Sequence, residues 1–402
     1  MTRAGRLTAA VALAMVLTAC ASTSGEKTDP AESPSPAVTT DPAVQPQGTA
    51  IRRGPSALDD PADPDLPTPL IDVEDLMSGG PPPDGIPAID HPVFEPVADV
   101  DWLKPDEPVM SLTVSGVTKA YPIRIMTWHE IVNDRLGGVP VAVTYCPLCN
   151  SGVAFERTVR GHVTTFGTSG LLYADNLVMY DRLTESLWPQ LTGQASVGTL
   201  TGTQLMSIPM GTVGWAQFRA EHPDAVVLSR TTGYERPYGS NPYFRYDDPG
   251  SDPLFEVPGG TDARLPAKTR VVGVGDGEQA VAIRRDLLAQ TGVQHVTLGS
   301  ERVVLWHVAG QRSALDTAAI PEGQEIGTVA AFEASAAGRP LDFVDAEDGT
   351  FRDEQTGSSW NVFGRAADGP LRGQQLRAIA YQDTFWFAWV AFQPETALIT
   401  GP

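Results

Sequence analysis

The sequence predicts a mainly β fold of the β-rich α+β class, made of two related, pseudo-duplicated lobes of antiparallel strands with a few short helices. Two observations predict the strands: apolar and polar residues alternate in short runs over most of residues 86–402, and turn-forming residues separate the runs. A third observation, a motif order that recurs once along the chain, predicts that the strands form two lobes. A secretion signal and a disordered tether are expected to precede them.

The first element is a predicted lipoprotein signal peptide at residues 1–19. Arg3 and Arg6 precede an apolar run at 7–17, and the small residues before Cys20 resemble the bacterial lipobox, where the cysteine carries the lipid. The run is shorter than the roughly 20 apolar residues that a membrane-spanning helix needs. We therefore expect an exported protein, anchored on the extracytoplasmic side of a lipid bilayer through a lipid on Cys20.

Residues 20–85 are expected to form a disordered tether. Pro, Ser, Thr and Asp dominate this stretch without apolar periodicity, so it cannot bury enough surface to offset chain entropy. The whole chain has 28 Lys and Arg against 49 Asp and Glu, and a formal net charge of −21. A charge of that sign excludes nucleic acid as an expected partner, because phosphates repel it.

The first lobe is expected at residues 86–232. The stretches "PVMSLTVSG" and "TKAYPIRI" predict a hairpin that turns at Ser115 and Gly116, and "VPVAVTY", "GVAFERTV" and "HVTTFG" predict further strands. Two helices are predicted. One covers Ile123–Leu136, where apolar residues recur at helical spacing before two glycines, and the other covers Trp215–Glu221, which ends before a proline.

The second lobe is expected at residues 268–402, after a connector rich in Tyr, Pro and Gly at 233–267. Asp181–Trp188 matches Asp353–Trp360 in the seven-residue step from acid to indole, and Gly, Ala and Leu follow both indoles in the same order. The pair "AYPIR" and "AVAIR" is a weaker match. Where the first half has "VTYCPLCNS", the second has "VLWHVAGQR" without cysteine. The fold is therefore not expected to require the cysteines, and a functional role for them is favoured.

Two of the three cysteines, Cys146 and Cys149, lie in a stretch that predicts a turn between strands. A thioredoxin-like centre needs the first cysteine at a helix start, which lowers the thiol pKa, and the alternating residues after this turn argue against one. The Cys-Pro-x-Cys-Asn order resembles a metal knuckle, in which Asn150 would tolerate the left-handed backbone. In an exported protein a disulfide also persists. A disulfide, a metal site and free thiols all stay open for the pair.

A metal at this pair would be a zinc, copper or iron ion. The chain has no second C-x-x-C, so His, Asp, Glu or solvent must complete the ligands. His129, on the predicted helix before the cysteine strand, and His162, on the strand after it, are the candidate ligands or proton carriers. A histidine beside an apolar helix face is also compatible with a structural role.

A polar cleft is expected beside the cysteines. Its candidate lining residues flank the cysteines or belong to the segment that starts at Gly167, and they are Tyr145, Asn150, Thr168, Ser169, Tyr173 and Asn176. The alternative for this segment is a turn followed by a strand whose Leu177 and Met179 face the core.

Seven longer stretches carry a family resemblance, and they are "AYPIRIMTWHEIVND", "GGVPVAVTYCPLCNSGVAFER", "FGTSGLLY", "DNLVMYDR", "SLWPQLTGQA", "TGSSWNVFGRA" and "FWFAWVAF". Together they resemble a bacterial and archaeal family known as domain of unknown function 3179 (DUF3179), over about residues 86–397. The family usually has Gly where this chain has Asn150. The resemblance implies an exported or lipid-anchored protein with a cysteine knuckle, and it implies no particular activity.

Two functional hypotheses follow. In the first, an extracytoplasmic lipoprotein binds a metal or cycles as a thiol/disulfide redox pair at Cys146 and Cys149. In the second, the protein is a non-catalytic binding or assembly module in which the two cysteines form a structural disulfide. The sequence names neither a substrate nor a protein partner.

Overall fold

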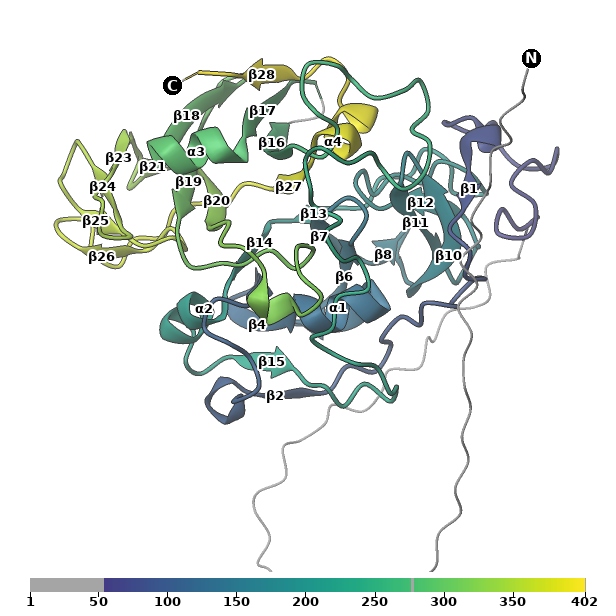
Figure 1. Cartoon of the computed structure of the whole chain (residues 1–402), viewed down its shortest axis with the longest axis horizontal. Helices are drawn as coiled ribbons and strands as arrows, with labels where there is room; N and C mark the ends of the chain where they lie inside the picture. The colour runs from purple at the N-terminus through teal and green to yellow at the C-terminus, as the bar shows by residue number, and fades with distance from the viewer. Residues whose placement is uncertain (1–53, 276–277, 402) are drawn as a thin grey trace, which may run out of the picture. The chain divides into compact units, whose positions relative to one another are not determined.

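The computed structural model describes residues 54–275 and 278–401. The predicted signal peptide, Cys20 and the tether as far as residue 53 lie outside the described residues. The described chain is mainly β with four short α-helices, which confirms the predicted fold class (Figure 1). Within these residues, no helix is long and apolar enough to cross a membrane.

The first lobe follows two short N-terminal elements, the 3-10 turn Val73–Asp75 and strand β1 (Met77–Ser78). Its elements are β2 (Phe94–Pro96), a 3-10 turn (Val97–Asp99), β3 (Pro108–Val114), β4 (Val117–Pro122), α1 (Ile123–His129), β5 (Ile131–Leu136), β6 (Val139–Cys146), β7 (Ser151–Glu156), β8 (Thr158–Val159), β9 (His162–Val163), β10 (Phe166–Tyr173), β11 (Asn176–Asp181), β12 (Leu187–Pro189), β13 (Ser207–Ile208), β14 (Met210–Gly214), α2 (Trp215–Glu221) and β15 (Val226–Leu228).

The second lobe repeats this order of elements. They are β16 (Arg270–Gly275), β17 (Ala280–Arg284), α3 (Arg285–Thr291), β18 (Val293–Leu298), β19 (Glu301–Val308), a 3-10 turn (Ile320–Glu322), β20 (Thr328–Glu333), β21 (Ser335–Ala336), β22 (Arg339–Pro340), β23 (Phe343–Asp345), β24 (Phe351–Asp353), β25 (Ser359–Trp360), β26 (Ala366–Asp368), β27 (Tyr381–Phe385), α4 (Trp386–Phe392) and β28 (Ala397–Ile399).

The sheets of the two lobes have corresponding strand orders. The order β14-β3-β4-β15 in the first lobe recurs as β27-β16-β17-β28 in the second, and in both the last pair is parallel while the others are antiparallel. Likewise β5-β6-β7 corresponds to β18-β19-β20, and β10-β11-β12 to β23-β24-β25. The repeat predicted from the motif order is therefore present in the topology, while the lobe boundaries stay a prediction.

The matched Asp and Trp residues make the same contacts in each lobe. The indole Nε1 of Trp188 donates to Asp181 Oδ2 at 3.1 Å, and that of Trp360 donates to Asp353 Oδ2 at 2.9 Å. All four residues are fully buried. Each carboxylate also accepts hydrogen bonds from the turn between the acid and the indole, so it holds together a turn that precedes a core tryptophan.

The weaker sequence match is out of register. Val109 pairs with Pro122 in the first lobe and Val271 pairs with Arg284 in the second, so Pro122 corresponds to Arg284. The match of "AYPIR" to "AVAIR" instead places Arg124 with Arg284. The two-residue error arises because alternating strands of similar composition resemble each other at any even offset.

The predicted helix at Ile123–Leu136 is wrong in its second half. The helix ends at His129, and Ile131–Leu136 forms β5, which pairs with β6. Glu130 adopts a φ of 58°, which ends the helix without Gly or Pro. The other predicted helix, Trp215–Glu221, has the predicted bounds.

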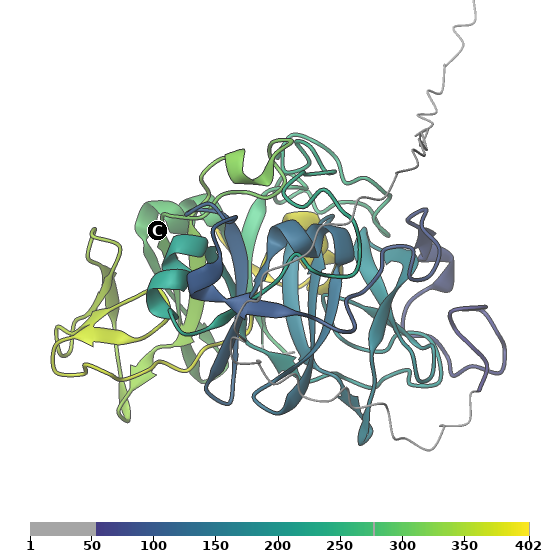
Figure 2. The ribbon, with the colours of Figure 1, turned by 90° about the horizontal axis from the view of Figure 1, so that it is seen from below.

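The prediction of a disordered tether is wrong for residues 54–85. Strand β1 pairs with β10, and Ala57, which is fully buried, belongs to a cluster with Val178 and Leu187. Figure 2 shows the purple N-terminal segment beside the teal strands of the first lobe. Five further apolar side chains of this segment pack against the cluster, and they are Leu58, Leu66, Ile71, Val73 and Leu76. Their spacing follows no helical or strand period, so composition alone hid a segment that packs as irregular chain.

Candidate functional site

The two cysteines lie in the turn between β6 and β7. The backbone N–H of Asn150 donates to the carbonyl oxygen of Pro147 at 3.1 Å, and Asn150 has a φ of 53°, the left-handed conformation that its position in the knuckle predicts. The side chains of Cys146 and Cys149 approach to 3.5 Å. Both thiols are free and buried, so the structure holds the pair as a dithiol.

Hydrogen-bond donors point at both sulfurs. The backbone N–H of Leu177 donates to Cys146 Sγ at 3.4 Å, and the side-chain Nδ2 of Asn176 donates to Cys149 Sγ at 3.3 Å. The Cys149 thiol in turn donates to the carbonyl oxygen of Asp175 at 3.4 Å. Burial, and then the neighbouring Cys146, raise the pKa of Cys149 well above its ordinary value. The Cys149 thiol is therefore protonated at neutral pH while it stays buried.

The second lobe gives a reference for the residues around this turn. The N–H of Tyr145 donates to the Glu130 carbonyl at 2.8 Å, and the N–H of His307 donates to the Gly292 carbonyl at 2.9 Å. These two bonds occupy the same place in corresponding sheets. Tyr145 therefore corresponds to His307, and Glu130 corresponds to Gly292.

Aliphatic residues of the second lobe replace polar residues that surround the sulfurs. Cys146 is the residue after Tyr145, so it corresponds to Val308. Gln190 lies two residues after the repeated tryptophan and corresponds to Val362. Since a valine suits the same scaffold position in both cases, the thiol and the amide are not required by the fold.

Glu130 is a buried acid in a conformation that glycine favours. It is 6% exposed, and its counterpart Gly292 has a similar φ of 69°. Burial raises the pKa of Glu130 to about 8. In the described part of the chain, no hydrogen bond to its carboxyl group is present. Strain and burial of an unpaired acid both oppose folding, so this residue is a candidate for a functional role.

The connector closes over the cysteines through Asp175. Tyr246 Oη and the backbone N–H of Leu254 both donate to Asp175 Oδ2 at 2.9 Å. The other carboxyl oxygen, Oδ1, is buried and has no hydrogen-bond partner among the described residues, and burial raises the pKa of Asp175 to about 6. The ammonium group of Lys268, which is 2% exposed, lies 3.4 Å from the centroid of the Tyr246 ring. Aromatic and charged groups thus cover the thiols.

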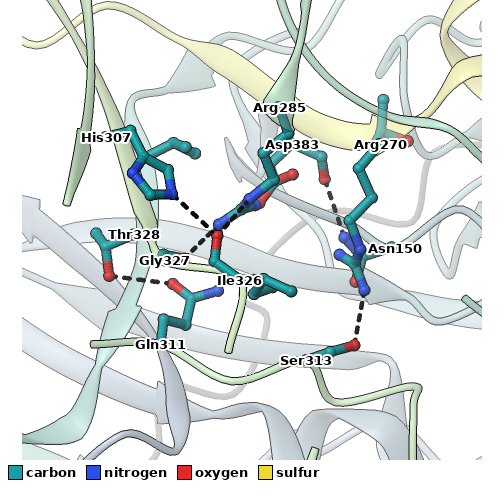
Figure 3. A network of polar contacts seen from close by, with 12 residues as sticks. Asn150, Arg270, Arg285, His307, Gln311, Ser313, Ile326, Gly327, Thr328 and Asp383 are labelled. Atoms are coloured by element: carbon teal, nitrogen blue, oxygen red, sulfur yellow. Dashed lines mark hydrogen bonds and ion pairs between the residues drawn. The ribbon is translucent and has the colours of Figure 1, made fainter. Parts of the chain in front are cut away.

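The second lobe holds the other side of the cysteine turn. The carbonyl oxygen of Cys149 accepts from Thr384 Oγ1 at 2.7 Å and from the N–H of Phe385 at 3.1 Å, and Asn150 Nδ2 donates to the carbonyl oxygen of Asp383 at 3.4 Å. Figure 3 shows the Asp383 side chain beside Arg285, with which it forms an ion pair. Movement of the turn is therefore opposed by contacts from β27.

A small polar cavity of about 30 Å³ lies between the lobes beside the turn. Tyr145 and Asn150 line it from the first lobe, and Gln311 and Asp383 line it from the second. Its volume suits roughly two water molecules. Asp383 Oδ1 is buried without a hydrogen-bond partner among the described residues, which makes it a place for such a water.

The structure does not bring the two candidate histidines to the cysteines. The ring nitrogens of His129 are occupied, Nδ1 by the Pro87 carbonyl at 2.7 Å and Nε2 by Tyr238 Oη at 2.6 Å. His162 lies in the β8–β9 hairpin, where it pairs with Val159. Across residues 54–275 and 278–401, no three His, Cys, Asp or Glu side chains form a group that could hold a metal ion. The sequence failed here because adjacent elements can direct their side chains to opposite faces.

The six residues expected to line a cleft have different roles. Asn176 contacts the Cys149 sulfur, and Tyr145 and Asn150 line the interlobe cavity. Thr168 Oγ1 donates to the Ile86 carbonyl at 2.8 Å and Ser169 Oγ donates to the Val178 carbonyl at 2.5 Å. Tyr173 is half-buried and packs against Phe392. Thr168, Ser169 and Tyr173 therefore stabilise the fold around the site.

Sequence analysis missed three residues of this site: Glu130, Gln190 and Lys268. Glu130 was assigned to the interior of a helix, where an acid draws no attention. Gln190 could have been found by aligning the repeats in the correct register, since its counterpart Val362 is aliphatic. Lys268 directly follows the connector and gives no sequence signal.

A two-lobed β protein with one buried, polar dithiol turn is the class that this fold and site define. The chain belongs to the family described as "Protein of unknown function (DUF3179)", whose model matches residues 83–396. Neither the curated proteins nor the solved structures contain a match to the chain.

Proposed function

We propose that the protein is an exported, lipid-anchored thiol–disulfide redox protein in which Cys146 and Cys149 alternate between a dithiol and a disulfide. The observation that carries this proposal is the 3.5 Å approach of two free thiols inside one turn. Disulfide formation needs the sulfurs to reach about 2.05 Å, a shift that a four-residue turn can absorb.

The proposed reaction is exchange with a disulfide of a partner protein or small molecule. One cysteine loses its proton, and its thiolate attacks a sulfur of the partner disulfide; a mixed disulfide forms and one partner thiolate leaves and is protonated. The second cysteine then loses its proton and attacks the first, which expels the other partner thiol. The pair loses two electrons and two protons, and the partner disulfide gains both.

The comparison of the two lobes supports a role beyond folding. Val308 occupies the place of Cys146 in the second lobe, so the scaffold forms around an aliphatic residue there. A pair kept only as a structural staple would be expected where its loop is otherwise weakly held. Here the Cys149 carbonyl already accepts two hydrogen bonds from β27.

Metal binding by the same thiols is the second candidate. The left-handed Asn150 and the N–H groups directed at both sulfurs are typical of turns that hold a thiolate-bound ion. A zinc, copper or iron ion would then be held by the two cysteines together with main-chain or solvent ligands, since neither His129 nor His162 contacts the sulfurs.

The proposal is tested on the full chain in its own membrane. Cells are quenched in acid and thiols are labelled with a maleimide before and after treatment with diamide or dithiothreitol, with the Cys146→Ser/Cys149→Ser variant as control. We expect the labelling of the pair to change in both directions. A pair that stays oxidised under both treatments supports the binding-module hypothesis, and stoichiometric metal in the purified dithiol supports the metal site.

Export and anchoring are tested separately. Changing Cys20 to Ser is expected to move the protein from the membrane to the soluble fraction or to leave the signal uncut. A correctly cut variant that still needs detergent for extraction would contradict the lipid anchor.

A further inference from the structure

We infer that Asn176 and Gln190 form a positioning pair that fixes a hydrogen-bond donor on the Cys149 sulfur and thereby sets the redox properties of the cysteine pair. This inference rests on the proposed function. Gln190 is fully buried and corresponds to an aliphatic residue of the second lobe, so the fold does not explain a polar side chain at this place.

Gln190 uses the hydrogen-bonding capacity of both ends of its amide. Its Nε2 donates to Thr144 Oγ1 at 3.0 Å and to the Ser151 carbonyl at 3.2 Å. Its Oε1 accepts from Ser151 Oγ at 2.9 Å and from Asn176 Nδ2 at 3.1 Å. Because a buried amide left unpaired is costly, this complete set of partners holds the side chain in one orientation.

The backbone groups at the two ends of this chain of bonds fix its direction. The Ser151 carbonyl can only accept, so Nε2 of Gln190 must face it and Oε1 must face Asn176. At the other end the N–H of Leu191 can only donate, at 3.1 Å, so Asn176 must turn Oδ1 toward it. The Nδ2 group of Asn176 is then left to face Cys149 Sγ at 3.3 Å. If the Asn176 amide were flipped, its Nδ2 would face the donor N–H of Leu191, and its Oδ1 would face the acceptor Oε1 of Gln190.

The consequence is a donor that favours negative charge on one sulfur. An N–H group stabilises a thiolate more than it stabilises the sulfur of a disulfide, because hydrogen bonds to charged groups are the stronger ones. The donor therefore stabilises the thiolate that attacks a partner, and at alkaline pH, where that thiolate is populated, it shifts the equilibrium toward the reduced form. Its loss should slow exchange and make the pair more readily oxidised.

The test compares the wild type with Asn176→Ala and Gln190→Val, the latter copying the second lobe. Gln204→Val, at an exposed position, controls for the Gln-to-Val change itself, because among the described residues the Gln204 amide donates to the main-chain carbonyls of Thr192 and Leu205 and contacts neither cysteine. We expect Asn176→Ala to react with oxidised glutathione about ten-fold more slowly, as loss of a charge-assisted hydrogen bond implies. Gln190→Val should slow the reaction less, and at alkaline pH, where the Cys149 thiolate is populated, both variants should shift the equilibrium with glutathione toward the disulfide.

A second measurement needs no variant and covers the case in which these variants fail to fold. In wild-type protein labelled with ¹⁵N-asparagine, the side-chain amide resonances of Asn176 should shift when the pair is oxidised. The inference would be overturned if folded variants exchanged with glutathione at the wild-type rate and equilibrium, or if the Asn176 resonances did not shift on oxidation. In either case a wild-type pair that still oxidises and reduces would leave the proposed function standing. A wild-type pair that does not oxidise reversibly would overturn both.

Discussion

Glu130 and Gly292 occupy the same position at the ends of corresponding helices, α1 and α3, with φ values of 58° and 69°. Glycine adopts this left-handed conformation without a steric penalty, whereas a residue with a Cβ pays roughly 1–2 kcal/mol. The first lobe thus keeps a strained and buried acid where its repeat has the residue that suits the backbone. We interpret the difference as stability given up for a role near the cysteine turn.

Replacing Glu130 with Gly is expected to stabilise the fold. The change removes backbone strain and a buried acid, which favours folding, while the added glycine loses more conformational entropy on folding, which opposes it. The free energy of unfolding is expected to rise by about 1–3 kcal/mol. Urea unfolding measures it. As a matched control, Gly292→Ala should destabilise, because its Cβ would meet Asp345 Oδ2 at 2.2 Å. A destabilised Glu130→Gly variant would show that the carboxyl group supports the fold.

The raised pKa of Glu130 predicts a pH dependence of stability. Its pKa is about 8 in the folded protein and ordinarily 4.5, so the unfolded chain loses this proton at lower pH than the folded one. The favourable contribution of the neutral acid is full below about pH 4.5 and is lost as the pH rises to about 8, with a slope of at most about 1.4 kcal/mol per pH unit.

Glu130→Gln should flatten this dependence. The free energy of unfolding is measured in urea at several pH values across that window for the variant and the wild type. Asp175, whose pKa is raised to about 6, contributes a slope of the same sign in both proteins, so the difference isolates Glu130. Parallel curves for the two proteins would contradict a raised pKa at Glu130.

The sequence predicted strands where alternation is long and turns are marked. The hairpin of β3 and β4 is an example: Ser115 and Gly116 both have positive φ, at 51° and 78°, and form the turn that their residue types indicate. The end of α1 could not be predicted, because Ile131–Leu136 carries apolar residues that suit a helix face as well as a strand. Tertiary pairing with β6 decides between them.

The repeated Asp–Trp contact predicts equal effects in the two lobes. In the wild type, each carboxylate accepts hydrogen bonds from N–H and O–H groups of its turn. Asp181→Asn and Asp353→Asn would each place a donor NH2 group among these donors. Each is expected to destabilise by about 2–4 kcal/mol, since buried donors lose a charged acceptor. Urea unfolding of both variants measures the effect. A neutral result at one position alone would show that the two tryptophans are not held equivalently.

The segment at residues 54–84 is expected to be needed for stability. A variant that begins at Gly85 loses the β1 pairing and Asp84, which accepts from Tyr180 Oη at 2.5 Å and pairs with Arg182 at 2.9 Å. We expect its thermal midpoint to fall by roughly 5 °C or more relative to a variant that begins at Gly54. Equal midpoints would mean that the packing seen around Ala57 contributes nothing.

The sequence identified the centre of the site and few of its partners. Cys146 and Cys149 stood out because the chain has so few thiols, and Asn176 was named as a cleft residue. His129 was a reasonable candidate on chain proximity, yet it bonds to Pro87 and Tyr238. The groups that a side chain contacts depend on how its element packs in the fold, which the chain proximity of a helix and a strand does not determine.

The measurement that tests the central claim most directly is a redox titration of the purified wild-type protein. The chain is equilibrated in buffers of reduced and oxidised dithiothreitol, quenched in acid, and its alkylated cysteines are located by peptide mass spectrometry. We predict that Cys146 and Cys149 lose and regain their thiols together, as a single two-electron transition with the same midpoint from either direction. Thiols that resist every ratio, or a disulfide that never reopens, would contradict a redox role for this pair.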